Sequence, residues 1–141
     1  MKTPDVNVLM YAVNADSPQH EAARGWLESS FAGAGGMAFC WPVLVGFLRL
    51  STRSGIFSRP LTLEQALGLV DAWLAHPAAR VLAPTERHAA ILAGLLLAKG
   101  RGGNLVSDAH IAALAIEHGA EVGTFDRDFE QFAGLRMTLL T

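Results

Sequence analysis

The fold of this chain is decided near its N-terminus by the stretch PDVNVLMYAVNADSPQH, which spans residues 4–20. The segment 6–13 within it is almost wholly apolar and predicts a buried β-strand. A carboxylate, Asp5, precedes this segment, and Asn7 lies just inside it. An unpaired charge beside a core is costly, so Asp5 either lies harmlessly at the rim of the strand or binds a ligand. The rest of the sequence has to distinguish these two possibilities.

Outward from this stretch, apolar strand patterns alternate with helical patterns, which predicts an α/β fold. Further strands are expected at residues 35–40, 80–84, 120–125 and 135–140. Helices are expected from Ser17-Pro18 to Gly33, over 41–55, from Thr62 through Leu74, from Thr85 towards Lys99, and from Ser107 to Gly119. The hydroxyl residues at these starts are typical N-terminal caps, and Thr62 with Gln65 forms a capping box. Short connections between strand and helix imply a mostly parallel sheet of four to five strands flanked by helices.

Composition favours one compact domain over residues 1–141, since 51% of the residues are hydrophobic and 17% are charged. No stretch resembles a membrane span, and the first residues lack the layout of a signal peptide. The single cysteine, Cys40, cannot form an internal disulfide and fits the reducing cytoplasm. The net charge of −2 gives no basic field, but two bound divalent cations would bring it to +2 (−2 + 4). A phosphate-bearing substrate therefore stays possible.

Three acidic residues lie where a parallel sheet forms its ligand crevice, at the carboxyl end of a strand and at a helix start. Asp126 follows the strand at 120–125, Asp128 comes two residues later, and Asp108 lies in the first turn of a predicted helix. Each alone has a structural explanation, because the helix dipole favours Asp108 and Asp supports the turn at 126–128. Grouped with Asp5, these carboxylates would repel one another, and a hard divalent cation would remove that repulsion.

Signatures of other enzyme classes are absent from the sequence. The five histidines have no zinc-ligand spacing, and neither a GxSxG elbow nor a phosphate-binding P-loop occurs. The glycine-rich KGRGGN at 99–104 follows a predicted helix and indicates a flexible turn. His88 and His110 lie on predicted helices, where a structural role is the simpler interpretation for each.

Three blocks of the sequence resemble the signature blocks of PIN-domain ribonucleases, and most closely those of VapC-type toxins from bacterial toxin–antitoxin pairs. They are DVNVLMYA (5–12), NLVSDAHIAALAIEHGA (104–120) and TFDRDF (124–129). FLRLSTRSGIF (47–57), followed by RPLTLEQAL (59–67), also resembles one VapC subgroup, so the likeness covers nearly the whole chain. The resemblance implies a PIN-like three-layer fold and cleavage of RNA with Mg²⁺ or Mn²⁺.

Residue by residue, the resemblance implies that the metal ligands are Asp5, Asp108 and Asp126. Asp128 would be an auxiliary catalytic acid, and the supporting polar residues would be Asn7, Asn104 and Thr124. The family usually has a glutamate in the helix after the second strand, and Gly46 occupies that position here. Occupancy by two metals is therefore in question, and Glu86 or Glu21 are possible substitutes.

The resemblance also implies an RNA substrate, a small VapB-like antitoxin whose C-terminal segment crosses the cleft, and a homodimer. The candidate cations for binding the flanking phosphates are Arg49, Arg53, Lys99 and Arg101. The candidate aromatic residues for an antitoxin groove are Trp26, Trp41, Phe47, Phe57 and Trp73. For any single one of these aromatic residues, packing in the core is the simpler role.

Two other functions stay open from the residues. A degenerate PIN domain would bind antitoxin or RNA without cleaving it, and Gly46 is the reason to consider this. A phosphoaspartyl enzyme or receiver-like domain also places Asp at strand ends. Such phosphatases carry DxDx[TV], whereas Asn7 replaces the second acid here, and no lysine for a receiver follows Lys99.

Overall fold

Five short strands form one parallel sheet in the computed structural model, which describes residues 1–141. The strands are β1 (Lys2–Pro4), β2 (Met37–Phe39), β3 (Ala79–Val81), β4 (Glu121–Thr124) and β5 (Met137–Leu139). Their order across the sheet is β3-β2-β1-β4-β5, and every neighbouring pair is parallel. The central strands β1 and β4 are therefore neighbours, although they come from opposite ends of the sequence. The predicted parallel α/β sheet is confirmed.

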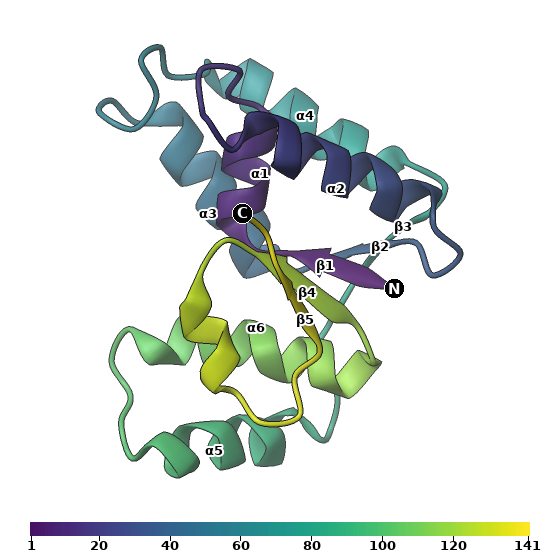
Figure 1. Ribbon diagram of the computed structural model, residues 1–141, viewed down its shortest axis with the longest axis vertical. Coiled ribbons are helices and arrows are strands. Elements are labelled where there is room, and N and C mark those ends of the chain that lie inside the picture. Colours follow the sequence, from purple (N-terminus) through teal and green to yellow (C-terminus); the bar gives the residue numbers. More distant parts are fainter.

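Helices cover both faces of this sheet and give the three layers expected of a PIN-like fold (Figure 1). They are α1 (Val6–Ala12), α2 (His20–Ala32), α3 (Trp41–Thr52), α4 (Leu63–Ala75), α5 (His88–Lys99), α6 (Leu105–His118) and the 3-10 helix η1 (Arg127–Gln131). Helices α1 to α4 lie on one face, while α5 and α6 pack against each other on the other face (Figure 1).

The predicted strand at residues 6–13 is wrong, because Val6–Ala12 form helix α1 and the first strand is the preceding Lys2–Pro4. A short apolar run fits a buried strand or a buried helix equally well, and the valines favoured the strand. Val8, Leu9 and Met10 are buried, so the run still enters the core as expected. The chain turns from strand to helix at Asp5, whose side chain caps α1 by accepting from the Val6 amide.

Three of the predicted helix starts lie a few residues from the observed ones. Helix α2 begins after Gln19, α5 after Arg87 and α6 after Asn104, and none of these three residues donates or accepts a side-chain capping bond. The hydroxyl residues expected at these starts therefore do not cap the helices. Ser107, for example, lies inside the first turn of α6. The capping box at Thr62 and the left-handed Gly119 that ends α6 are confirmed.

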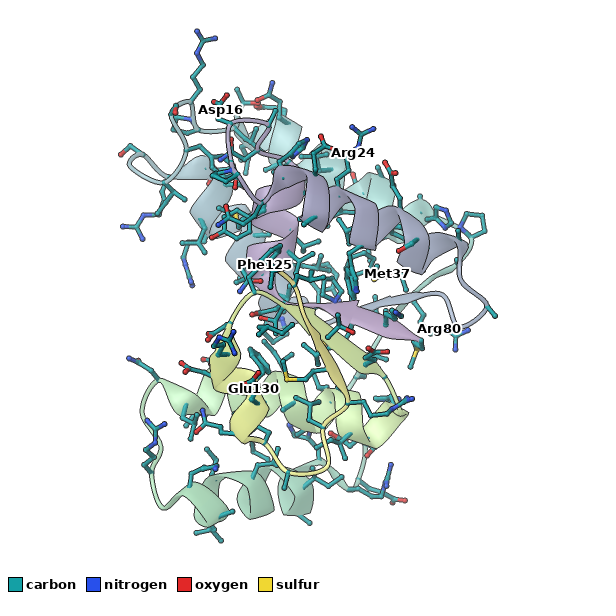
Figure 2. The ribbon with its side chains drawn as sticks, viewed as in Figure 1. Asp16, Arg24, Met37, Arg80, Phe125 and Glu130 are labelled. Atoms are coloured by element: carbon teal, nitrogen blue, oxygen red, sulfur yellow. The ribbon has the colours of Figure 1, made fainter.

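The core lies mainly between the sheet and its two helical layers. Met37 on β2 is fully buried and points into the layer beneath α2 (Figure 2). Trp26 of α2 packs so closely on β4 that a Cβ atom added to Gly123 would lie 2.2 Å from its ring. This contact fixes the strand immediately before Thr124. None of the helices has the length and hydropathy needed to span a membrane.

Candidate active site

Asp5 lies at the carboxyl end of β1, beside the same end of β4. Its amide donates to the Gly123 carbonyl at 2.9 Å, which extends the β1–β4 ladder by one residue. The Asp5 side chain is 5% exposed, and its Oδ1 accepts from the Val6 amide at 2.8 Å. A carboxylate is thus held at the junction of the two central strands and the start of α1.

Thr124 and Asn7 hold the second oxygen of Asp5. The Thr124 hydroxyl donates to Asp5 Oδ2 at 2.8 Å, and Asn7 Nδ2 donates to the same oxygen at 3.1 Å. Asn7 Oδ1 accepts from the Phe125 amide at 3.2 Å, and Thr124 Oγ1 accepts from the Asp126 amide at 2.9 Å. Residues from α1 and from the end of β4 therefore orient Asp5 together, in the supporting role predicted for Asn7 and Thr124.

Two further acids lie in the turn that follows β4. The chain bends sharply there because the Asp128 amide donates to Asp126 Oδ1 at 2.9 Å. Asp128 is exposed and Asp126 is half-buried. Phe125, the residue before this turn, packs edge-on against Tyr11 of α1, with the ring centres 5.0 Å apart.

Asp108 of α6 belongs to the same cluster of charges. Burial, followed by the negative charges of Asp5, Asp126 and Asp128, raises the pKa of Asp108 from 3.8 to about 6. Burial also raises the pKa of Asp5; the hydrogen bonds from Thr124 and Val6 counteract this rise, and the charge of Asp126 adds to it. The charges of the other three acids therefore disfavour the ionisation of Asp108, and the charge of Asp126 disfavours that of Asp5. The four predicted acids are called the acid cluster below.

The donor set of the acid cluster suits a hard divalent cation, because oxygen ligands and excess negative charge are what Mg²⁺ and Mn²⁺ prefer. No group of three or more His, Cys, Asp or Glu side chains is already arranged as a metal site in the structure. The ligand roles of Asp5, Asp108 and Asp126 thus stay a prediction.

A cleft of about 550 Å³ opens beside Asp5 and Asp108, between helices α3 and α6. Gly46 of α3 lines this cleft, so the position of the family's glutamate does face the acid cluster. A Cβ atom at Gly46 would meet Val6 Cγ2 at 3.4 Å, a tight but ordinary contact. Neither Glu86 nor Glu21 lines the cleft, so neither replaces the missing carboxylate.

Several other predicted site residues lie away from the cleft. Asn104 is exposed, and its side chain makes no hydrogen bond to any acid, so its supporting role stays a prediction. Of the four predicted phosphate-binding cations, only Arg49 lines the cleft. Among the five aromatic residues, Trp26 and Phe47 are buried in the core, whereas Trp41 is 49% exposed.

Sequence reasoning missed a second polar group at the cleft. His110 lines the cleft, and its Nδ1 lies 2.9 Å from Nε2 of His88, whose Nδ1 bonds to the buried carboxylate of Glu117. His110 and Glu117 are seven residues apart on α6 and thus share a helix face. A glutamate on an otherwise apolar helix face was the available signal for this group.

Comparisons with known proteins agree with this geometry. The family model described as PIN domain matches residues 2–135. Ribonuclease VapC37 of Mycobacterium tuberculosis is 48% identical over 136 residues, which cover 96% of this chain and 94% of that protein. Ribonuclease VapC33 of the same species is 37% identical over 138 residues, which cover 98% of this chain and 96% of that protein.

Solved structures show the same fold at lower identity. A chain of the Rickettsia felis VapBC2 complex, bound to a DNA fragment from its promoter, matches with a TM-score of 0.73 and 21% identity. The match covers 99% of this chain and 98% of that one. Mycobacterium tuberculosis VapC20, a Sarcin-Ricin loop cleaving toxin, matches with a TM-score of 0.68 and 19% identity over 96% and 99% of the two chains. With the family model and these relatives matched over nearly its whole length, the chain belongs to the PIN-domain family, among the VapC ribonucleases.

Proposed function

We propose that this chain is a single-domain, metal-dependent endoribonuclease that hydrolyses RNA phosphodiester bonds, and that it acts as a VapC-like toxin in the cytoplasm. The main support is the acid cluster beside the cleft, in which the charges of three acids raise the pKa of Asp108. Relatives at 48% and 37% identity that are named ribonucleases support the reaction class.

Asp5, Asp108 and Asp126 would hold Mg²⁺ or Mn²⁺, with Asp128 as an auxiliary ligand or a base towards water. When bound, such a cation lowers the pKa of a bound water and offsets negative charge on the phosphoryl oxygens. The chain's own contribution is orientation, since Asn7 and Thr124 fix Asp5 through three hydrogen bonds to its carboxylate and to each other. Three acids held at one edge of a rigid sheet need little rearrangement when substrate arrives.

Arg49 is the cation best placed to contact the RNA backbone. It is exposed on α3 and lines the cleft that contains Asp5 and Asp108. Its guanidinium would bind a phosphate next to the one being cleaved. Arg53, Lys99 and Arg101 lie outside this cleft, so we assign them no part in the site.

We further propose that a small antitoxin binds over the cleft. The solved structures with the same fold include VapBC complexes from Rickettsia felis and from nontypeable Haemophilus influenzae. In this chain, Val45 of α3 and Val106 of α6 line the cleft and are 52% and 41% exposed. A peptide with apolar side chains and one cationic group would match this apolar rim and the acid cluster behind it. We also propose that two copies of this chain form a homodimer.

A second candidate is a PIN domain that binds RNA or antitoxin without cleaving RNA. Gly46 favours it, because this position faces the cleft and supplies no carboxylate. The two proposed functions differ only in whether the bound RNA is cleaved, so a cleavage assay distinguishes them.

The test uses purified protein, freed of antitoxin, incubated with total RNA and with tRNA in Mg²⁺, Mn²⁺ or EDTA. Discrete products that require metal and disappear in Asp5→Asn and Asp108→Asn would support the ribonuclease. Asp71→Asn, a change at an exposed site on α4, is the matched control and should cleave normally. Absence of cleavage with every metal, by a protein that is folded and binds RNA, would favour the second candidate.

A further inference from the structure

A second pocket opens beside the cleft, between α1 and the loop that joins α3 to α4. Its volume is about 240 Å³, and its walls include Met10 and Tyr11 of α1 and Ile56 and Phe57 of the loop. We call it the side pocket. Sites for drug-sized ligands usually have volumes of about 300 Å³ or more, so the side pocket suits a single ring-sized group.

The side pocket adjoins the acid cluster. Val6 and Leu50 line both the side pocket and the cleft, so the two are continuous. Asn7 also lines the side pocket, and its Nδ2 donates to Asp5 Oδ2 at 3.1 Å. A group bound in the side pocket would therefore lie next to a group bound at the acid cluster.

The walls of the side pocket are largely apolar, and most of them are fixed by the fold. The Tyr11 ring packs edge-on against Phe125, and Met10 is buried. Ile56, by contrast, is 49% exposed and does not pack against the core. A flat apolar group in the pocket would remove part of the exposed surface of Ile56 from water, which is favourable.

Asn14 offers a free hydrogen-bond donor at the end of the side pocket away from the acid cluster. Its Oδ1 accepts from the Asp16 amide at 3.2 Å, so its oxygen faces that amide and its NH₂ group remains without a partner in the protein. Asn7, the other amide of the pocket, already uses both of its N–H groups within the protein. A bound group therefore needs an acceptor on its edge at Asn14.

Unpaired arginines lie on both sides of the side pocket. Arg49 lines the cleft, and Arg59 lines an outer pocket of about 390 Å³, which shares Asn14 and Phe57 with the side pocket. The two loops that form the outer pocket lie together at the upper end of the molecule (Figure 1). Both arginines are exposed, and neither forms an ion pair, although Asp16 also lines the outer pocket.

The groove formed by the three pockets thus presents a cation, an apolar pocket and a second cation, in that order. Single-stranded RNA presents the complementary order, because a flat base with acceptors on its edge lies between two phosphates. An apolar side chain of a protein partner would also fill the side pocket, but it would leave the Asn14 donor unused. A base inside a duplex has both its faces and its pairing edge covered, so the pocket suits an unpaired base.

We infer that the side pocket binds one unpaired base of the RNA, next to the phosphate held at the acid cluster. Ile56 packs on this base, and the NH₂ group of Asn14 donates to its edge. The inference rests on the proposed RNA substrate and adds a requirement for an unpaired nucleotide beside the cleaved bond. It assigns substrate binding to two residues that the acid cluster does not use.

The experiment compares RNA oligonucleotides of one cleavable sequence, each lacking the base at a single position near the cleaved bond but keeping its ribose and phosphates. For the wild-type protein, removal of the base at one position should lower kcat/KM about tenfold, the size of one stacked base. Ile56→Ala removes the exposed wall of the pocket. Asn14→Asp removes the donor but keeps the acceptor for the Asp16 amide. Each variant should reduce the penalty to about threefold, and the double variant to about onefold.

Leu63→Ala is the matched control, because Leu63 is an exposed aliphatic residue of α4 that lines none of the three pockets, and it should keep the full penalty. Each penalty compares two substrates on one protein, so a general loss of RNA affinity from the charge added by Asn14→Asp cancels. The inference is overturned if the penalty persists in the double variant. It is also overturned if no position shows a penalty in the wild-type protein, which would leave the pocket to a side chain of a protein partner.

If the wild-type protein cleaves no RNA, the proposed function fails by itself, and binding then decides the inference. Fluorescence anisotropy with the same oligonucleotides should show weaker binding when the base is missing at one position, and this difference should disappear in the double variant. Equal binding of all oligonucleotides, or no binding of RNA, would overturn the inference as well.

Discussion

Asp5 accepts hydrogen bonds from Val6, Asn7 and Thr124, so one carboxylate both caps α1 and joins the acid cluster. Replacing it affects the fold and the site together. Asp108 is the cleaner probe at the scale of single residues, because its pKa is raised by burial and by neighbouring charges and it makes no capping bond.

The first prediction concerns Asp108→Asn in metal-free buffer. Because the pKa of Asp108 is about 6 in the folded chain and 3.8 is its ordinary value, the folded chain binds the extra proton between these pH values. The fold therefore loses stability as the pH rises from 4 to 6, by roughly 1–2 kcal/mol once partial exposure is allowed for. At pH 7.5 with EDTA, Asp108→Asn should raise Tm by about 3–6 °C. At pH 4 the two proteins should melt together.

Thermal unfolding followed by circular dichroism measures this difference, with Asp71→Asn as the control at an exposed site. An equal rise in Tm at both pH values would mean that the neighbouring charges are not the cause.

At the scale of single residues, the residues that could be predicted from the sequence were those identified by their type and by their order along the chain. The four acids, Asn7 and Thr124 come together as expected because strand ends in a parallel sheet share one edge. Asn104 lies in an exposed turn and makes no side-chain hydrogen bond to the acids. The contacts of His88 with His110 and Glu117 were missed because these partners, 22 and 29 residues away in sequence, meet His88 only when α5 packs on α6.

At the scale of elements, one helix was predicted as a strand, and the acids predicted for the site nevertheless lie together, while their roles stay predictions. Asp5 precedes the expected strand at 6–13 but follows the observed strand Lys2–Pro4, so its assignment to the site came from the resemblance of DVNVLMYA to a PIN-domain block. The pattern of a buried apolar run does not show where a strand ends and a helix begins. That boundary depends on where hydrogen bonding to the neighbouring strands stops.

The second prediction tests the packing of α2 on β4. A Cβ atom at Gly123 would overlap the Trp26 ring at 2.2–2.6 Å, so Gly123→Ala should destabilise the fold by about 3 kcal/mol or more. Urea unfolding followed by tryptophan fluorescence measures the loss. Gly68→Ala, at a helical glycine with open space around it, should instead stabilise the fold by about 1 kcal/mol. Equal stabilities for the two variants would contradict this contact.

The third prediction concerns Gly46 of α3, which lines the same cleft as Asp108 of α6. Gly46→Glu adds a carboxylate inside the cleft with only a tight contact to Val6, so it should bind Mn²⁺ about tenfold more tightly than the wild-type chain. Isothermal titration with Mn²⁺ gives the affinity directly. Gly68→Glu makes the same chemical change on the exposed face of α4 and should leave the affinity unaltered. A similar gain in both variants would show that only net charge matters.

At the scale of the whole molecule, the net charge of −2 gives no attraction for RNA, so binding depends on how charge is arranged around the cleft. The parallel α/β sheet could be predicted from the sequence because the alternating order of strand and helix patterns allows few parallel topologies. Helix starts were less predictable, since α2, α5 and α6 begin at residues whose side chains make no capping bond.

The fourth prediction is that Mn²⁺ stabilises the whole fold through the acid cluster. At a concentration about a hundredfold above its Kd, a ligand of the folded state adds about 2.7 kcal/mol, so Tm should rise by about 5–10 °C. The rise should be absent in Asp5→Asn and intact in Asp71→Asn. Differential scanning calorimetry with and without Mn²⁺ measures it, and an equal rise in Asp5→Asn would place the cation elsewhere.

Because β1 and β4 are neighbours, the acid cluster joins residue 5 to residues 124–128. During synthesis on the ribosome, Asp5 emerges long before Thr124 and Asp126 exist. A nascent chain therefore carries the first acid without its partners until β4 and the turn after it have been made. Premature termination or proteolysis anywhere before β4 leaves fragments that lack the cluster, so the order of translation itself delays the assembly of the site.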